Sequence, residues 1–266
     1  IFADELEPDK LPTIYSFNQE WLGAMEYASQ MARYEWRSAY KLGYFEQAWS
    51  ADLASAYPVL MGRLPDTDKC YIKYSKGKRL AADWAIMKGR VTVEVEVSPF
   101  VYDAGDSLIL PRGTWEGIFT SDIINWLYLN NAGSFEIEDG YFFKWASSYR
   151  PYAAVVNRLL AARQTDDGIA AHLAKRIGQG LSGKLDQSNK DGSWGEFYNP
   201  ILAAMVRERC RVKVANFIYR HGLQECLVAV VVDNVLADMP IVLTEADVAC
   251  GWRLEETMPA LVLSKG

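Results

Sequence analysis

The sequence predicts an α+β fold in which an antiparallel sheet is backed by helices. One indication is the run Val91–Val97, where valine alternates strictly with polar residues, as in a half-buried strand. A second is Cys226–Val232, a continuous apolar and largely β-branched run that is typical of a strand buried on both faces. The third is a set of segments with helical spacing of apolar residues, which includes a short two-helix hairpin.

The first half of the chain supplies both kinds of element. Residues 17–42 carry spaced large apolar side chains, which predict a helix leading into a strand that ends at Asp52. The segment Thr120–Asn130 predicts a second helix, with Thr120 or Ser121 as its cap. The segment Ser134–Trp145 predicts a hairpin that turns at Asp139-Gly140.

The second half is mainly helical before its last strands. An Ala- and Leu-rich helix is expected from Arg150 to about Arg163, because Pro151 suits a first helical turn. The run Asp166-Asp167-Gly168 predicts a turn and a cap for a second, antiparallel helix to about Gly180. A longer helix is expected over Asn199–Tyr219. The basic residues of the helical hairpin have a plain alternative interpretation as solvated faces.

Composition excludes several classes of protein. The 266 residues are 50% hydrophobic, which is enough for a folded core in one or two subdomains. The 4 cysteines are scattered and there are only 2 histidines, so a zinc site, a disulfide framework and a histidine-based triad are not expected. A reducing, cytoplasmic location fits this cysteine usage. No apolar run approaches the roughly 20 residues of a membrane span. A net charge of −6 leaves nucleic-acid binding to local basic strips.

The segment Trp49–Pro58 contains the first candidate functional residue, Asp52. This aspartate is expected at a strand end, followed by small residues and by Pro58, which fixes its own φ. A carboxylate in that position can hold a divalent cation. The alternative is that Asp52 simply accepts hydrogen bonds from nearby main-chain N–H groups, as most aspartates before turns do.

Asp233 is the second candidate, because it directly follows the buried run Cys226–Val232. The pair Asp233-Asn234 stands between two apolar runs and predicts a hairpin. An ionised carboxylate beside a buried sheet costs several kcal/mol unless a cation or donor accepts it. Two such acids and a basic helical hairpin between them suit nucleotidyl transfer, in which paired aspartates hold two metal ions and basic residues neutralise phosphates.

Three segments carry a resemblance to a known family. Asp52–Pro58 matches Asp-x-x-Ser-Leu-Tyr-Pro with Ala56 in place of Leu, and Lys175–Gly183 is similar to Lys-x-x-x-Asn-Ser-x-Tyr-Gly in its Lys and closing Gly. Val231–Asn234 is similar to Asp-Thr-Asp-Ser and keeps the second acid. These are motifs of family B DNA polymerases, and the chain resembles the palm and fingers of that family, most nearly its viral, plasmid and organellar branch, which includes protein-primed enzymes.

Weaker similarities follow the same order along the chain. Tyr40–Gly43 is similar to the Tyr-x-Gly-Gly segment that touches the template, with one Gly replaced. Arg163 is placed like the family's other triphosphate-binding cation, and Ser264–Gly266 resembles the start of the Lys-x-Tyr motif that grips the primer. The resemblance therefore extends from about Tyr40 to Lys265.

The resemblance also implies a division of the chain into parts. It implies an antiparallel palm sheet backed by helices, with a short two-helix fingers hairpin. The expected parts are a helical lead-in over 1–44, a first palm part with an insertion over 45–148, fingers over 149–184 and a second palm part over 185–266. No proofreading exonuclease is expected before Asp52 and no thumb after Lys265, so the expectation is a catalytic core or a piece of a larger enzyme.

The family's site residues can be carried over to the matching positions. The resemblance implies that Asp52 and Asp233 bind two Mg²⁺ ions, with Mn²⁺ as a substitute, and that the carbonyl of Leu53 completes the metal site. The implied residues for nucleotide binding are Ser55, Ala56, Tyr57, Arg163, Lys175 and Gly183. The implied residues for contact with DNA are Tyr40, Gly43, Lys184 and Lys265. The implied partners are primer-template DNA, deoxynucleoside triphosphates and a terminal protein or other replication proteins.

Departures from the family pattern keep other functions open. Ser182 replaces a Tyr that packs against the nascent base pair, and Val231 replaces the first acid of the third motif. One alternative is a polymerase-like module that has lost catalysis and serves in nucleic-acid binding or scaffolding. Another is a different metal-dependent phosphoryl-transfer fold, such as a nuclease.

Overall fold

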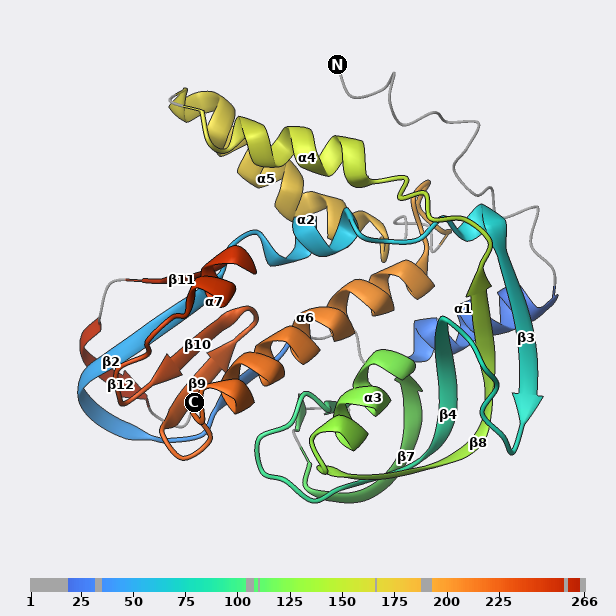
Figure 1. The fold of residues 1–266 in the computed structure, drawn as a ribbon, viewed down its shortest axis with the longest axis horizontal. Coiled ribbons are helices and arrows are strands. Elements are labelled where there is room, and N and C mark those ends of the chain that lie inside the picture. Colours follow the sequence, from blue (N-terminus) through green and yellow to red (C-terminus); the bar gives the residue numbers. More distant parts are fainter. Residues whose placement is uncertain are drawn as a thin grey trace. The chain divides into compact units, whose positions relative to one another are not determined.

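The computed structural model shows an α+β chain whose sheets are antiparallel (Figure 1). It describes residues 19–31, 35–103, 108–109, 111–165, 167–187, 193–255 and 258–263. These divide into two compact units. Unit 1 takes the described residues of Ile1–Met31, Tyr57–Glu94 and Gly113–Glu208, and unit 2 those of Ala32–Ala56, Val95–Arg112 and Arg209–Gly266. The predicted α+β class is confirmed, whereas the predicted palm and fingers boundaries stay a prediction.

Unit 2 is built on a six-stranded sheet with the strand order β1-β9-β10-β2-β11, and β12 also pairs with β2. Its strands are β1 (Arg37–Ala39), β2 (Gly43–Leu53), β9 (Leu227–Val231), β10 (Asn234–Ala237), β11 (Trp252–Leu254) and β12 (Met258–Leu263). All the pairings are antiparallel. The unit also contains α7 (Glu245–Ala249) and the small ribbon of β5 (Tyr102–Asp103) and β6 (Leu108–Ile109).

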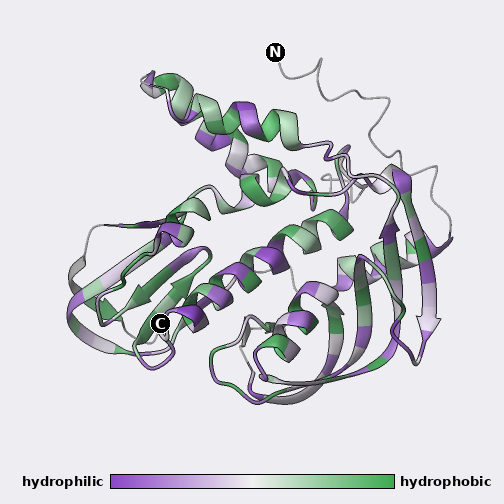
Figure 2. Cartoon of the chain, viewed as in Figure 1, coloured by the Kyte–Doolittle hydropathy of each residue, from purple (hydrophilic) through white to green (hydrophobic). Residues whose placement is uncertain are grey.

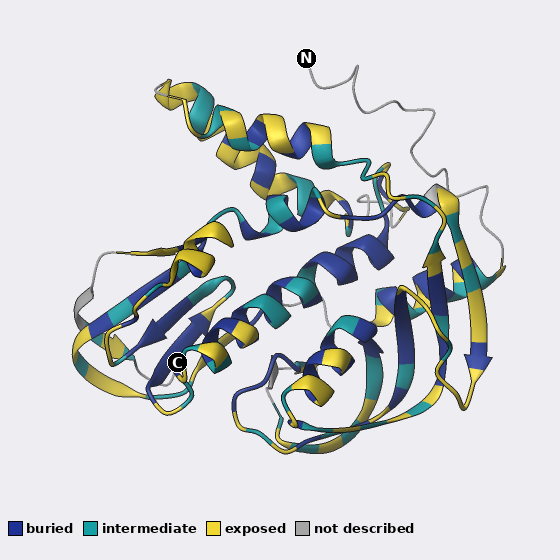
Figure 3. Ribbon diagram, in the orientation of Figure 1, coloured by how far each residue is buried: buried dark blue, intermediate teal, exposed yellow. Residues whose placement is uncertain are grey.

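The core of unit 2 follows from its apolar strands. Strands β9 and β10 are the buried centre of the sheet, and they are apolar along most of their length (Figures 2 and 3). Helix α6 (Pro200–Arg220) passes from unit 1 into unit 2. Its Phe217 is fully buried and stacks on Trp252 of β11, with ring centroids 3.9 Å apart. This stack fixes β11 against the helix.

Unit 1 contains a four-stranded sheet with the order β3-β8-β4-β7. Its strands are β3 (Cys70–Lys76), β4 (Trp84–Val93), β7 (Gly113–Thr120) and β8 (Gly133–Trp145), and its sheet contacts α1 (Gln19–Gln30) and α3 (Ser121–Leu129). Trp21 of α1 packs edge-on against Phe143, which also contacts Trp84. A short turn of 3-10 helix, η3 (Thr67–Lys69), precedes β3.

A pair of antiparallel helices completes unit 1: α4 (Ala153–Ala162) and α5 (Gly168–Lys184), with the short helix α2 (Ala56–Met61) nearby in Figure 1. The pair has a small core made by Val155, Leu159 and Ala174. The Asp167 carboxylate caps α5 by accepting from the N–H groups of Ile169 and Ala170 at 2.9 and 3.2 Å. The predicted helical hairpin and its cap are therefore confirmed.

Three predicted elements are corrected. The helix expected over 17–42 ends at Gln30, and β1 then pairs with β9, because the chain leaves unit 1 for unit 2. The alternating run Val91–Val97 stays in its ladder only to Val93, since Glu94 turns to bond the carbonyl of Ala132 and the chain again changes unit.

The hairpin expected at Asp139-Gly140 is instead a single strand, β8. A register shift against β4 marks a β-bulge there, and a Cβ on Gly140 would lie 2.8 Å from the carbonyl oxygen of Ile86. The glycine therefore allows close packing of two strands rather than a turn.

The other two helices were predicted well, and the last hairpin is present but turns one residue earlier than expected, at Val232-Asp233. The expected helix over Thr120–Asn130 is α3 with Thr120 at its N-cap, although the Thr120 hydroxyl donates to the buried Glu208 and makes no capping bond. The helix expected over Asn199–Tyr219 is α6. Within the described part of the chain, none of the helices combines the length and apolar character that crossing a bilayer requires.

Candidate active site

Asp52 lies at the end of β2, in the middle of a row of three strands in unit 2. Its register partner on β10 is Asn234, and its partner on β11 is Arg253. Directly opposed residues of antiparallel strands project from the same face of the sheet, so these three side chains share one face. After Leu53 the chain leaves the strand through a turn in which Ser55 has a φ of +54°.

Asp233 is brought to the same place by the hairpin between β9 and β10. The turn residues are Val232 and Asp233, and Asn234 opens β10. The carbonyl of Asp233 accepts a hydrogen bond from the N–H of Leu53 at 3.0 Å, which ties the turn to β2 beside Asp52. Val232 adopts a φ of +64°, an unfavourable region for a β-branched residue. The sheet holds this turn in a strained conformation that places the carboxylate.

The two carboxylates interact electrostatically. Partial burial, and after it the negative charge of Asp52, raise the pKa of Asp233 to about 6, while Arg253 acts in the opposite direction. Burial and a like charge both oppose ionisation. The pair therefore carries negative charge that the described protein groups compensate only in part.

Arg253 is the principal partner of Asp52. Its Nε and Nη2 donate to Oδ2 of Asp52 at 3.0 and 2.7 Å. The Asp52 side chain is only 15% exposed, whereas that of Arg253 is 56% exposed. Among the described residues, the Asp52 carboxylate accepts its hydrogen bonds from this guanidinium. The alternative in which Asp52 simply accepts from nearby main-chain N–H groups does not describe this structure.

A polar network continues along the same strands. Nδ2 of Asn234 donates to Ser50 Oγ at 2.8 Å and to Glu255 Oε2 at 3.1 Å, and Ser50 Oγ lies 3.1 Å from the same Glu255 oxygen. Sequence reasoning missed Arg253, Glu255 and Ser50. No motif marks the first two, because they reach the site only through the pairing of β11 and the following residues with β2.

The donors at this site suit a hard divalent cation. Mg²⁺ in proteins is commonly bound by one or two carboxylates together with substrate phosphates, and main-chain carbonyls also serve as ligands for hard cations. Asp52, Asp233 and the carbonyl of Leu53 provide such a set. In the described ranges there is no cluster of three or more His, Cys, Asp or Glu residues arranged to hold a metal. The fit therefore rests on a carboxylate pair.

The candidate nucleotide-binding residues divide between the units. Ser55 and the buried Ala56 belong to unit 2 with Asp52, whereas Tyr57, the second residue of α2, begins a segment of unit 1. Arg163 follows α4 as its C-cap, and Lys175 lies on the exposed surface of α5. Gly183 lies at the end of α5, next to the exposed Lys184, which is a candidate for contact with DNA. These four residues of the helical hairpin also belong to unit 1.

The candidate DNA-contacting residues in unit 2 are Tyr40 and Gly43. Burial raises the pKa of the Tyr40 hydroxyl, and the N–H of Tyr40 donates to the carbonyl of Val228 at 2.8 Å. Gly43 opens β2 with a φ of +131° and with open space where a Cβ would lie, so a side chain there is disfavoured by the backbone conformation and not by crowding. Lys265 lies outside the described residues.

Comparisons with known proteins identify the fold. No protein-family model and no curated protein sequence matches the chain. Solved structures do match: phi29 DNA polymerase with primer-template DNA and incoming nucleotides aligns at 13% identity and a TM-score of 0.71, over 97% of this chain and 50% of that one. Its binary complex with primer-template DNA gives 12% identity and a TM-score of 0.70, over 90% and 48%. An orthorhombic crystal form gives 11% and 0.68, over 92% and 49%.

These matches define the class of fold. The chain has a DNA-polymerase-like fold, and it spans about half the length of the polymerase chains that it matches. The fold that the motifs implied is thus present along nearly the whole chain. At this level of identity the likeness shows the fold alone.

Proposed function

We propose that this chain is the core of a template-directed DNA polymerase of family B, which transfers deoxynucleotides to a primer 3′ end by a two-metal mechanism. The observation that carries the proposal is that Asp52 and Asp233, which are remote in sequence, adjoin at one end of the sheet. Asp52 lies at the end of β2, and Asp233 lies in the turn before β10, where its carbonyl accepts from the N–H of Leu53. The polymerase-like fold supports it independently, because the solved structures that match the chain are those of phi29 DNA polymerase, two of them with primer-template DNA.

In this proposal Asp52 and Asp233 hold Mg²⁺, or Mn²⁺ in its place, together with the carbonyl of Leu53. When bound, such ions activate an attacking oxygen and neutralise charge that develops on the phosphates. The protein's own task is positioning. The hydrogen bond from Leu53 to Asp233 holds the two acids side by side, so that little reorganisation is needed when substrate arrives.

The remaining roles follow the family positions. Ser55, Ala56 and Tyr57 would contact the incoming nucleotide, with Tyr57 under its sugar, and Arg163 and Lys175 would bind the triphosphate. Gly183 would allow close approach near the nascent base pair. Tyr40, Gly43, Lys184 and Lys265 would contact DNA, in interactions that are salt-dependent wherever lysine meets phosphate. The partners would be primer-template DNA, deoxynucleoside triphosphates and a terminal protein or other replication proteins.

A second candidate is a catalytically degenerate module of the same fold that binds or scaffolds nucleic acid. Two observations favour it. Val231 stands where the family has the first acid of its third motif, and its side chain is 44% exposed at the end of β9. Arg253 also binds the carboxylate of Asp52 directly.

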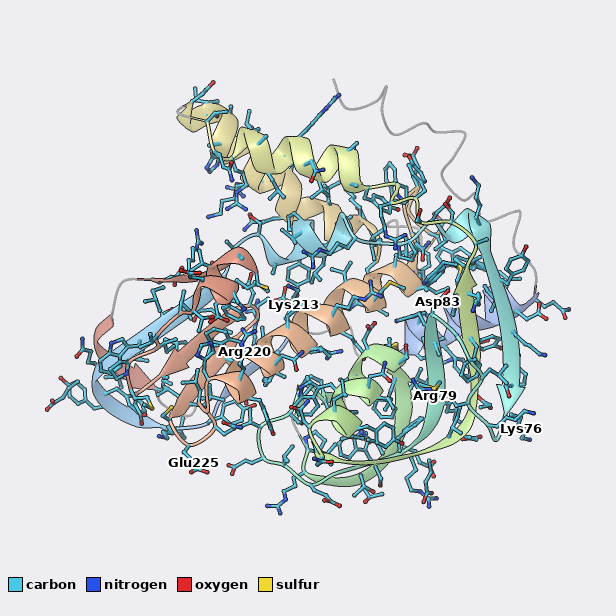
Figure 4. All side chains as sticks on the ribbon, viewed as in Figure 1. Lys76, Arg79, Asp83, Lys213, Arg220 and Glu225 are labelled. Atoms are coloured by element: carbon cyan, nitrogen blue, oxygen red, sulfur yellow. The ribbon has the colours of Figure 1, made fainter. Side chains whose placement is uncertain are left out.

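Primer extension by the purified chain with Mg²⁺ or Mn²⁺ tests the proposal. We expect extension by the wild type and a loss of at least about a hundredfold in Asp52→Asn and in Asp233→Asn, because each removes one of only two metal-binding acids. The matched control is Glu225→Gln, which removes an exposed carboxylate from the loop between α6 and β9 (Figure 4). This control should extend primers normally.

Three other outcomes are informative. Full extension by both aspartate variants would exclude the proposed metal site. Binding of primer-template without extension under any metal would favour the degenerate module. Digestion of DNA without added nucleotides would indicate a nuclease.

A further inference from the structure

The guanidinium of Arg253 holds one oxygen of the acid pair. Both of its hydrogen bonds, from Nε and Nη2, go to Oδ2 of Asp52. A bond of this charge-assisted kind is stronger than a neutral one. A divalent cation that uses Asp52 must therefore compete with a cation that belongs to the chain itself.

The backbone of Arg253 is fixed, whereas its side chain can leave. Trp252 is buried, stacks on Phe217 and pairs with Leu53 across the strands, and Arg253 itself pairs with Asp52 in the same register. The Arg253 side chain is nevertheless 56% exposed. Because the guanidinium reaches solvent while the strand is held by its pairing and by the Trp252 stack, the side chain can leave Asp52 without disturbing β11.

The charges around the pair explain why a cation of the chain lies there. Asp233 and Asp52 repel one another, and Glu255 is hydrogen-bonded to Asn234 and Ser50 in the same network. Arg253 bonds to Asp52, and its charge also favours ionised Asp233. One guanidinium offsets only part of this negative charge, so the acids keep an attraction for a divalent ion.

We propose that Arg253 is a positioning residue whose guanidinium occupies the carboxylate oxygen of Asp52 that a divalent metal ion would use. The metal ion must displace this guanidinium to bind, so Arg253 sets the metal affinity of the site. This inference rests on the proposed function, because it requires that Asp52 and Asp233 bind metal. It adds a residue outside the three matched motifs. It also predicts that the affinity of this site for divalent metal is lower than it would be without Arg253.

Binding of Mn²⁺ to the full chain, measured from the electron paramagnetic resonance signal of free Mn²⁺ at mildly alkaline pH, tests the inference without any assay of activity. Arg253→Met should bind Mn²⁺ about three- to tenfold more tightly, as expected when a partly exposed ion pair no longer competes. Arg253→Lys keeps the charge but loses the planar two-nitrogen contact, so its affinity should lie between those of wild type and Arg253→Met.

Arg90→Met is the matched control. The Arg90 side chain is 55% exposed and is paired with Glu116 and Glu136 on the sheet of unit 1. Its replacement removes the same charge at the same exposure, and Mn²⁺ affinity should not change. Thermal unfolding of each variant checks that the fold is kept, and Arg253→Lys provides the test if Arg253→Met does not fold.

The outcomes separate this inference from the proposed function. If Asp52→Asn and Asp233→Asn bind Mn²⁺ like wild type, the metal site does not exist and both ideas fail. If those variants lose Mn²⁺ binding while Arg253→Met binds no more tightly than wild type, the role of Arg253 is wrong and the metal site stands. An equal increase of Mn²⁺ affinity in Arg90→Met would also overturn the inference, since the increase would then come from the change in net charge of the protein.

Discussion

The sheet of unit 2 and the helical hairpin of unit 1 hold their candidate residues in different ways. Asp52 and its neighbours are tied by main-chain ladders to β10 and β11 and by Phe217 stacked behind β11. Lys175, in contrast, stands on an exposed surface of α5, and that hairpin has a core of only a few buried side chains. The sheet holds the carboxylate of Asp52 and the guanidinium of Arg253 in direct contact, whereas the hairpin carries basic side chains on helices that are stabilised by a small core.

The largest expected effect is on the sheet. Phe217→Ala removes a fully buried ring that stacks on Trp252, and should lower the free energy of unfolding by about 3–5 kcal/mol. Chemical denaturation monitored by tryptophan fluorescence measures it. The control is Leu254→Ala, which lies on β11 with Trp252 but is 50% exposed, and it should change stability by less than about 0.5 kcal/mol. Similar losses in the two variants would contradict the anchoring of β11 by this stack.

The second largest expected effect is a loss of stability in the α4–α5 hairpin. Leu159→Ala deletes a side chain that is 2% exposed in the small core of α4 and α5, at an expected cost of about 2–4 kcal/mol. Since that core is separate from the sheets, hydrogen exchange should quicken in α4 and α5 and stay unchanged in β9 and β10. Leu173→Ala, 54% exposed on α5, is the control and should leave exchange unaltered. Uniform quickening over both units would show that the hairpin is not an independent element.

A smaller effect concerns a buried acid that is well compensated. Burial alone would raise the pKa of Asp247, but the hydroxyl and main-chain N–H of Thr244 lower it, as do Arg220 and His221, and the net shift is downward. Arg220 lies at the end of α6 (Figure 4) and forms an ion pair with Asp247, while His221 lies 2.9 Å from it.

A carboxylate with a lowered folded-state pKa stabilises the protein above its unfolded pKa, about 3.9, and this stability is lost as the pH falls through the folded value. Asp247→Asn should therefore cost about 2 kcal/mol at neutral pH and flatten the acid limb of the stability curve. Urea denaturation between neutral and acid pH measures this change. An unchanged acid limb would contradict it.

The smallest expected effect is a gain of stability, opposite in sign to the loss expected for Asp247→Asn. The pKa of Asp233 is raised to about 6 by burial and by Asp52, so its ionisation destabilises the metal-free protein. The stability that comes from its protonated form is fully present below the unfolded pKa of about 3.9, and it is lost as the pH rises through about 6. Asp233→Asn should then stabilise the metal-free chain at neutral pH by about 1 kcal/mol, a value reduced for solvent screening at this partly exposed group. A loss of stability in this variant would show that Asp233 is compensated like Asp247.

Local sequence patterns were sufficient to predict an element wherever the residues that determine it lie within that element. The cap at Asp167, the long helix α6 and the buried strand β9 all follow from residues within each element. Prediction from local patterns failed where contacts between distant parts of the chain decided the local structure. Gly140 marks a close approach of two strands, and the alternation that ends in Val97 runs past the point where the chain changes unit.

The sequence by itself determined the α+β class, the order of the candidate acids and the helical hairpin, because apolar periodicity, caps and turn residues act over a few neighbouring positions. Only the tertiary structure decided that Asp52 and Asp233 adjoin and that Arg253 lies on Asp52. Those contacts join residues about 180 to 200 positions apart through strand pairing, and pairing register is not written in any one segment.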